Sequence, residues 1–336
     1  MASPVNRLAA ISLILASLSL MPPTAQQNVQ AQETRSVPRS TPAQHVAKYT
    51  PDIPPATFSE IAYGAHPRQV LDFWKASSVE PTPVAFVIHG GGWKGGSKER
   101  VNRFVEVNQL LNAGISVVAI NYRYVNQAKK AAATPPVHAP LHDAARALQF
   151  VRSKSQEWNL DKSKVGAAGG SAGACSSLWL AFHDEMQDPN SRDAINREST
   201  RLQCAAVRGA QTTLDPKQMR QWTPNSKYGG HAFGIQGQSF DAFYNARPKI
   251  LNWINEYSPY ALVSKDDPPV ALYYTAKPDL GKPQKDPTHT SNFGVKLQEH
   301  CQGTGTECQL VHPGVTSPEH TTPTEFLIHK LKGNTP

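Results

Sequence analysis

The sequence predicts a doubly wound α/β domain, and three observations support this fold class. Strand-like apolar segments alternate with helix-like segments over roughly residues 84–186, as in parallel sheets with crossover helices. Two glycine-rich motifs directly follow strand-like segments, at the edge where such sheets carry their sites. Apolar residues make up 39% of the 336 residues and charged residues 18%, which excludes a disordered chain and a polytopic membrane protein.

The predicted elements follow one another with little interruption. Residues 69–74 alternate around Leu71 and Phe73, so we expect an early antiparallel edge strand there. The next segments, in chain order, are strand 84–88, helix 98–113, strand 115–121, helix 141–158, strand 164–168 and helix 172–186. Residues 213–261 then form an aromatic-rich insertion, and two interpretations of it stay open. It either caps a binding cleft or packs as helices between strands.

The N-terminal residues predict export. Arg7 precedes an apolar run from Leu8 to Met21, and Val29-Gln30-Ala31 has the small-x-small form of a signal-peptidase site. We therefore expect a signal peptide over 1–31, with Ala25 as the alternative cleavage position and a membrane anchor or a buried first helix as the competing interpretations. Residues 32–56 are proline-rich and predict an extended linker, which leaves 57–333 for the folded domain. The predicted location is secreted or periplasmic, without a stable membrane anchor after cleavage.

Charge and cysteine content narrow the class further. The formal net charge is +8, but the basic residues are scattered, so no nucleic-acid partner is expected. The four cysteines have no zinc-site spacing, and an exported protein can oxidise them. We favour Cys301–Cys308 together with Cys175–Cys204 as disulfides, and four free thiols are the alternative. The sequence gives no oligomeric state.

The first chemical motif is Gly169-Gly170-Ser171-Ala172-Gly173, which has the form G-x-S-x-G. It follows a predicted strand and opens a helix of small residues, as a nucleophile elbow requires. Glycines on both sides of the serine let neighbouring backbone pack where a Cβ would collide. We therefore predict that Ser171 is a nucleophile at the carboxyl end of the sheet, above a helix N-terminus that favours negative charge.

The second motif is His89-Gly90-Gly91-Gly92-Trp93, directly after strand 84–88. The amides of Gly91 and Gly92, together with that of Ala172, are predicted to form an oxyanion hole. The same glycines also satisfy G-x-G-x-x-G. A dinucleotide site needs an acidic residue after the next strand, however, and that strand ends in Asn121-Tyr122-Arg123. No G-K-[ST] follows either, so a phosphate loop is excluded.

These three motifs, HGGGW, NYR and GGSAG, resemble those of the α/β-hydrolase serine carboxylesterases. The similarity is to the acetyl-xylan and feruloyl esterase-like (BD-FAE-like) and hormone-sensitive-lipase-like groups, and it covers about residues 57–331. It implies a mostly parallel, eight-stranded sheet flanked by helices, with a small cap after the sixth strand. It also implies a cofactor-free esterase with the chain order Ser, Asp, His, its acid after the seventh strand and its histidine after the eighth.

The resemblance places the seventh strand at 270–274 and makes Asp286 the expected triad acid. An eight-residue stretch, 278–285, interrupts the family's usual spacing, so Asp279 and a relocated acid such as Asp215 stay open as alternatives. Asp286 then leads into an expected helix at 292–300. A helix or turn cap is its ordinary structural role.

The resemblance also makes His320 the expected general base. It lies in the loop between an expected strand at 308–312 and a final helix at 323–332. His138 and His142 are four residues apart, but no third ligand is near them in the sequence, so no metal site is predicted. Trp93 is expected either to line the acyl or alcohol site or to pack beneath the glycine-rich loop.

The resulting hypothesis is an exported serine carboxylesterase that acts through an acyl-enzyme. Acetyl or feruloyl esters of polysaccharides, or other short-chain acyl esters, are the expected substrates. A small-ester or polyester hydrolase, related to lipases, is the alternative. A serine peptidase or a non-catalytic binding module on the same fold is a more distant one.

Overall fold

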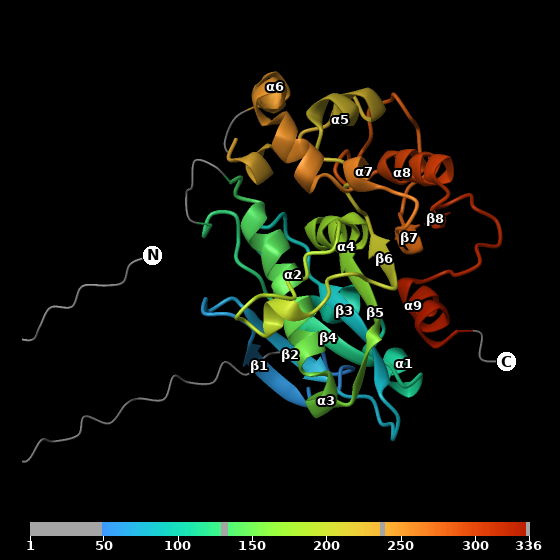
Figure 1. The fold of residues 1–336 in the computed structure, drawn as a ribbon. Helices are drawn as coiled ribbons and strands as arrows, with labels where there is room; N and C mark the ends of the chain where they lie inside the picture. Colours follow the sequence, from blue (N-terminus) through green and yellow to red (C-terminus); the bar gives the residue numbers. More distant parts are fainter. Residues whose placement is uncertain (1–48, 129–133, 236–238, 334–336) are drawn as a thin grey trace, which may run out of the picture. The chain divides into compact units, whose positions relative to one another are not determined.

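A computed structural model describes residues 49–333, apart from 129–133 and 236–238, and contains one eight-stranded sheet (Figure 1). The strand order is β1-β2-β4-β3-β5-β6-β7-β8. β1 and β2 pair antiparallel, as do β2 and β4, and every later pair is parallel. The strands are β1 Phe58–Ala62, β2 Val70–Trp74, β3 Thr82–Ile88, β4 Ser116–Ile120, β5 Leu160–Gly170, β6 Cys204–Arg208, β7 Val270–Tyr273 and β8 Cys308–Val311. The predicted fold class is confirmed.

The central strands are apolar on both faces because helices cover the sheet from both sides. β3 and β4 are buried at every position. β2 was expected at an edge, but β1, which the sequence did not reveal, pairs with its outer side. Exposed residues and a register shift between Phe58 and Ile61 break the alternation in β1, and this explains why it was missed.

Figure 1 shows α1 and α9 on one side of the sheet and α2 and α4 on the other, and two separate apolar clusters match these sides. The helices are α1 Val107–Asn112, α2 His138–Ser153, α3 Ser155–Trp158, α4 Ala172–Phe182, α5 Pro216–Trp222, α6 Phe240–Tyr257, α7 Pro259–Leu262, α8 Asn292–Thr304 and α9 Pro323–Lys332, with 3₁₀ turns η1 Lys98–Arg103, η2 Ile195–Arg197 and η3 Gly230–Phe233. The sheet therefore separates two cores, each with its own helices.

Two predicted helices are broken in the structure. The expected helix 98–113 consists of η1 and α1, because Lys98 is buried in ion pairs with Glu60, Asp72 and Glu99 and holds the first turn to the edge of the sheet. The expected helix 141–158 ends at Ser153, and α3 continues after Lys154. The final helix begins and ends as predicted, at Pro323 and Lys332.

The insertion after β6 packs as helices. Its described part contains α5, η3 and α6, and its aromatic rings stack on one another, as in the pair Phe233–Trp253 with centroids 6.5 Å apart. Arg247 of α6 pairs through two hydrogen bonds of 2.8 Å with Asp215, the N-cap of α5. Figure 1 shows α5 and α6 together, beyond α4.

The folded domain begins before Thr57. Tyr49 donates a hydrogen bond of 2.6 Å to Asp72, Ile53 is buried, and the Trp74 indole donates to the Pro54 carbonyl at 2.8 Å. The last residues of the expected linker thus pack against the sheet. The predicted signal peptide lies outside the described residues. None of the helices described is both long and apolar enough to cross a membrane.

The four cysteines are free thiols in the structure, and the Cys301–Cys308 disulfide stays a prediction. Cys175 lies in the apolar cluster on the α4 side of the sheet, whereas Cys204 lies in the cluster on the α9 side. The sheet itself separates these two sulfurs, and the predicted Cys175–Cys204 bridge is therefore wrong. Cys301 and Cys308 are neighbours, and the Cys301 thiol together with burial raises the pKa of Cys308.

Candidate active site

The turn between β5 and α4 is a nucleophile elbow. Ser171 has φ 54° and ψ −121°, a backbone conformation with positive φ that residues other than glycine rarely adopt. A Cβ at Gly173 would lie 2.1 Å from the Ile88 carbonyl oxygen, and one at Gly169 would lie 2.6 Å from the same atom. Because helix α4 approaches the end of β3 this closely, only glycine fits on either side, and Ser171 is held at the carboxyl end of the sheet.

The loop after β7 brings an imidazole and a carboxylate to Ser171. His289 Nε2 lies 2.9 Å from Ser171 Oγ, and His289 Nδ1 lies 2.8 Å from Asp286 Oδ2. The other carboxylate oxygen, Oδ1, accepts the backbone amides of Thr288 at 3.0 Å and His289 at 3.2 Å. Nucleophile, base and acid thus form one chain of hydrogen bonds, which is the geometry of a catalytic triad.

The Asp286 carboxylate is stabilised in its charged form. Partial burial acts to raise its pKa, but the hydrogen bond and charge of His289 and the two backbone amides outweigh that effect and hold the pKa below its ordinary value. An ionised Asp286 accepts a hydrogen bond from Nδ1–H, and this tautomer leaves Nε2 free to accept the proton of Ser171.

The structure contradicts the prediction that His320 lies beside Ser171. His320 is buried in the loop before α9, where Nδ1 lies 2.9 Å from Gln309 Oε1 and Nε2 lies 2.6 Å from His329 Nδ1. Both ring nitrogens are therefore occupied elsewhere. Burial lowers the pKa of this ring, which favours its neutral form.

The sequence analysis did not predict His289, because the resemblance places the general base in the loop after the eighth strand. The signal available in the sequence was the spacing Asp286-Pro287-Thr288-His289 in one loop. An aspartate that caps its own turn holds the backbone so that a side chain three residues later comes back to it. This local arrangement brings the two side chains together without help from another strand.

The alternative acids have other partners. Asp215 caps α5 and pairs with Arg247. Asp279 lies in an exposed turn, where its backbone amide donates to Asn292 at 2.8 Å. Neither Asp215 nor Asp279 has a hydrogen bond with His289 among the described residues. Of the three candidate acids, Asp286 is the one that contacts the imidazole.

The glycine-rich loop, residues 89–93, lies beside the elbow. Gly91 has φ 115° and Gly92 has φ 62°, so both need glycine. Gly90 and Gly91 line the cavity at Ser171, but Gly92 does not. The Ala172 amide is the first of α4 and has no earlier turn to donate to. Of the two predicted loop amides, that of Gly91 therefore lies at the cavity and that of Gly92 does not. Ala172 is also absent from the lining, and its amide is a candidate because it begins α4 beside Ser171.

Trp93 does not line the cavity. Its φ of 54° directs the indole into the protein, where it is buried and Nε1 donates to Ser176 Oγ of α4 at 3.0 Å. Its ring centroid lies 6.4 Å from that of Tyr228 and 6.0 Å from that of His231, both from the insertion after β6. Of the two expectations for Trp93, packing beneath the loop is the correct one.

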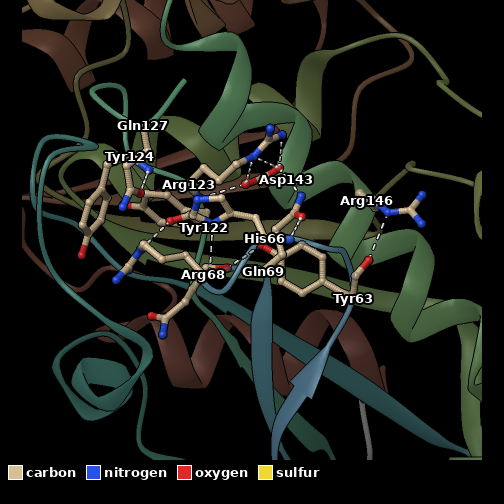
Figure 2. Close-up of polar contacts among 11 residues, drawn as sticks. Tyr63, His66, Arg68, Gln69, Tyr122, Arg123, Tyr124, Gln127, Asp143 and Arg146 are labelled. Carbon is tan, nitrogen blue, oxygen red and sulfur yellow. Dashed lines mark hydrogen bonds and ion pairs between the residues drawn. The ribbon is translucent and has the colours of Figure 1, made fainter. Parts of the chain in front are cut away.

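A partly buried polar network contacts the start of the glycine-rich loop, and Figure 2 shows its members Arg68, Tyr122, Arg123 and Asp143. Tyr122 donates to the His89 carbonyl at 2.7 Å, and Arg68 donates to the Tyr122 carbonyl at 2.8 Å. Arg123 pairs with Asp143 of α2 through its Nε and Nη2 atoms. The NYR segment thus ties the loop to β4 and α2.

His89 is a neutral member of this support. Burial lowers its pKa to about 3, and its Nδ1 lies 2.7 Å from the Gly90 carbonyl oxygen. Nδ1 therefore carries the proton and donates, and Nε2 faces Arg68 at 3.4 Å. The ring stacks on Tyr122 with centroids 4.2 Å apart, which fixes the start of the loop.

The cavity at Ser171 has a volume of about 420 Å³. We call it the Ser171 cavity; its polar lining includes Asp286 and His289 and three arginines, Arg100, Arg103 and Arg208. Phe104 forms one wall, since a Cβ at Gly170 would lie 2.4 Å from its ring. No described residue of the insertion 213–261 lines it, so the described part of the insertion packs elsewhere.

One group of described side chains has the composition of a metal site. Ligand atoms of Glu319, His320 and His329 lie within 4.8 Å of one another. The two imidazoles hydrogen-bond directly to each other, however, and so occupy the nitrogens that an ion would need. The group is also absent from the lining of the Ser171 cavity, and it has no part in the chemistry at Ser171.

The chain is similar in sequence to known proteins. The BD-FAE family model matches residues 71–284. The chain is 28% identical over 141 residues to gut esterase 1 of Caenorhabditis elegans, covering 41% of this chain and 25% of that protein. It is 27% identical over 117 residues to esterase LipC of Mycobacterium tuberculosis, covering 34% and 27%. The chain thus spans about a quarter of the length of these curated relatives.

Solved structures share the fold at low identity. An acetyl ester-xyloside bifunctional hydrolase from Caldicellulosiruptor lactoaceticus superposes with a TM-score of 0.54 at 22% identity, covering 72% of this chain and 76% of that one. A truncated carbohydrate esterase from gut microbiota gives 0.58 at 16%, covering 79% and 89%. These likenesses support the fold, and the family model covers more than half of the chain. The chain therefore belongs to the BD-FAE family and has an α/β-hydrolase fold.

Proposed function

We propose that the protein is a carboxylic ester hydrolase that works through Ser171, His289 and Asp286. The observation that carries this proposal is the pair of hydrogen bonds that joins the three side chains, at 2.9 and 2.8 Å, beside an open cavity. The esterase names of the relatives and structural neighbours support the same reaction type.

The mechanism follows from this geometry. Ser171 Oγ attacks the ester carbonyl while His289 Nε2 accepts its proton, and Asp286 stabilises the resulting imidazolium. The amides of Ala172 and Gly91 stabilise the oxyanion. The tetrahedral intermediate then collapses, and His289 protonates the departing alcohol. Water, activated by the same imidazole, attacks the acyl-enzyme and releases the acid.

The substrate and the location belong to the same proposal. The expected substrates are short acyl esters carried by polysaccharides, because the cavity is open and two structural neighbours are a carbohydrate esterase and an acetyl ester-xyloside bifunctional hydrolase. Small esters and polyesters are the alternative. Export is proposed from the leader-like residues 1–31.

The general base is tested by replacing each of the two candidate histidines, His289 and His320, with asparagine. We expect His289→Asn to lower kcat/KM on 4-nitrophenyl acetate by about 10⁴-fold or more, as Ser171→Ala does, because the serine loses its proton acceptor. His320→Asn keeps most of the activity, since its ring lies outside the cavity. Thermal melting checks that each variant is folded. Loss of activity in folded His320→Asn together with an active His289→Asn would overturn the assignment.

The acid is tested in the same assay. Asp286→Asn should lower kcat by roughly 10⁴-fold, because an amide no longer stabilises the imidazolium or fixes its tautomer. Asp279→Asn is the matched control and should retain activity, since that carboxylate does not contact His289. Acetylated xylan and methyl ferulate, assayed beside 4-nitrophenyl esters from acetyl to palmitoyl, determine the substrate range. If none of these esters is hydrolysed by the wild type, the proposal fails.

A further inference from the structure

We propose that the Ser171 cavity binds an anionic group of its substrate, a carboxylate or sulfate carried close to the ester bond. This inference rests on the proposed esterase function and adds a substrate class to it. The observations that carry it are three cavity-lining arginines and the scarcity of acidic groups near them.

The three arginines reach the cavity from two sides. Arg100 and Arg103 lie in η1, and Arg208 is the last residue of β6. All three line the cavity together with Ser171. The Arg208 carbonyl accepts the Ser171 amide at 3.0 Å, so this arginine starts on the strand next to the nucleophile. A group held by its guanidinium is therefore close to the reacting ester.

None of the three guanidiniums forms an ion pair or a side-chain hydrogen bond with the described part of the chain. Other arginines of the domain do form ion pairs, for example Arg123–Asp143, Arg220–Asp241 and Arg247–Asp215. The cavity arginines thus keep all their donors available for a ligand.

The acidic groups nearby do not neutralise this charge. Asp286 is the one carboxylate in the lining, and it is already engaged by His289 and two backbone amides. Glu106 attracts Arg208 from outside the cavity, beyond ion-pair distance. Arg208 is exposed at the cavity and has no ion-pair partner among the described residues. An incoming anion supplies that partner.

The chemistry of the donors selects the ligand. Guanidinium groups bind carboxylates and sulfated or phosphorylated groups through pairs of parallel hydrogen bonds, and such charge-assisted bonds are stronger than neutral ones. Phe104 and Tyr273 provide apolar walls, and a volume of about 420 Å³ holds a small ester. The anion can be carried by the acyl chain or by the alcohol, for example as an acidic sugar.

Matched ester pairs test the proposal with the wild-type protein. In the acyl arm, the mono-4-nitrophenyl ester of adipic acid is compared with 4-nitrophenyl hexanoate. In the alcohol arm, acetylated methyl galacturonoside and acetylated methyl galactoside 6-sulfate are compared with acetylated methyl galactoside. We expect kcat/KM to favour the anionic ester by about tenfold or more in one arm, mainly through KM. The preference should shrink as salt is raised, because ions screen the arginines.

Arginine variants test which residues cause the preference. Arg208→Gln, Arg103→Gln and Arg100→Gln should each move the anionic-to-neutral ratio of kcat/KM toward one. Arg192→Gln removes an exposed arginine outside the cavity and should leave that ratio unchanged.

The outcomes separate the two proposals. If neutral esters are hydrolysed through Ser171 but no anionic ester is preferred in either arm, the anion site is wrong and the esterase function stands. The anion site is also wrong if the preference survives in all three arginine variants. If neither neutral nor anionic esters are hydrolysed, the esterase proposal itself fails, and this inference falls with it.

Discussion

A single residue, Ser171, shows how a local conformation produces the site. Its left-handed backbone lifts Oγ out of the line of β5 and places it at the N-terminus of α4. That conformation costs roughly 1–3 kcal/mol for a residue with a side chain, and the surrounding packing must compensate for it. Gly169 and Gly173 make this packing possible because they allow the backbone of β3 to come within contact.

The buried carboxyl of Asp267, just before β7, makes the stability of the protein depend on pH. Its side chain is buried, one oxygen accepts the Ser264 amide at 2.6 Å, and the other has no hydrogen-bond partner. Burial raises the pKa of this carboxyl from 3.8 to about 6. A raised folded-state pKa stabilises the protein below the unfolded value, and this contribution is lost as pH rises through the folded value.

We therefore expect Asp267→Asn to gain stability over the wild type as pH rises from about 4 to about 6, and to keep that gain above it. The measurement is the difference in Tm between variant and wild type at several pH values. Asp266→Asn is a control of opposite sign. Hydrogen bonding by Ser264 lowers the pKa of Asp266, so its removal should cost stability at neutral pH and little in acid. A difference for Asp267→Asn that does not vary with pH would contradict the argument.

Among the elements, helix α2 supports the glycine-rich loop through its residue Asp143. Its Asp143 accepts Gln69 at 2.7 Å and the Arg123 backbone amide at 2.8 Å, in addition to the Arg123 guanidinium (Figure 2). Through Arg123 and Tyr122 the helix holds the loop that contains Gly90 and Gly91. The strand-to-loop transition after β3 therefore depends on a helix that lies much later in the chain.

Removing this carboxylate should loosen the loop. We expect Asp143→Ala to destabilise the protein by about 3 kcal/mol, because it leaves buried donors without an acceptor. We also expect it to lower kcat more than it raises KM, since a less ordered oxyanion hole stabilises the transition state less well. Denaturant unfolding and steady-state kinetics measure the two effects. The control is Asp193→Ala. Asp193 is the exposed ion-pair partner of Arg146, which also belongs to α2, and its removal should change the free energy of unfolding by about 1 kcal/mol or less. Equal effects of the two variants would refute a special role for Asp143.

For the molecule as a whole, the sheet determines which cysteines can be joined. Cys301 in α8 and Cys308 in β8 lie on neighbouring elements, and their thiols are close enough for Cys301 to raise the pKa of Cys308. Cys175 and Cys204 are separated by the sheet. Oxidation can therefore bridge the first pair without moving the core, but not the second.

We expect protein purified from an oxidising compartment to carry the Cys301–Cys308 bridge and two free thiols. Alkylation of the unfolded, unreduced protein, followed by intact mass measurement, should add two groups; after reduction it should add four. A peptide that links Cys175 to Cys204, or four alkylated thiols before reduction, would exclude this arrangement.

The sequence predicted most of the fold because its signals are local. Strands such as 84–88 and the helix 323–332 were recognisable from apolar runs, periodicity and flanking prolines. Elements that depend on distant partners were not: β1 has an irregular register, and the turn at Lys98 is fixed by a buried ion cluster. The site divides in the same way. The elbow at Ser171 is a motif of consecutive residues, whereas its base comes from a distant loop.

The sequence therefore indicated the central strands and the elbow at Ser171, and the resemblance made Asp286 the expected acid with Asp279 and Asp215 left open. The tertiary structure decided which of twelve histidines meets Ser171, because the loop after β7 folds over Gly209 and the loop after β8 buries His320 against His329. It also decided that three arginines, two from η1 and one from β6, share a cavity with the nucleophile. Residues more than a hundred positions apart come together only when the sheet orders its strands, and no local pattern records that order.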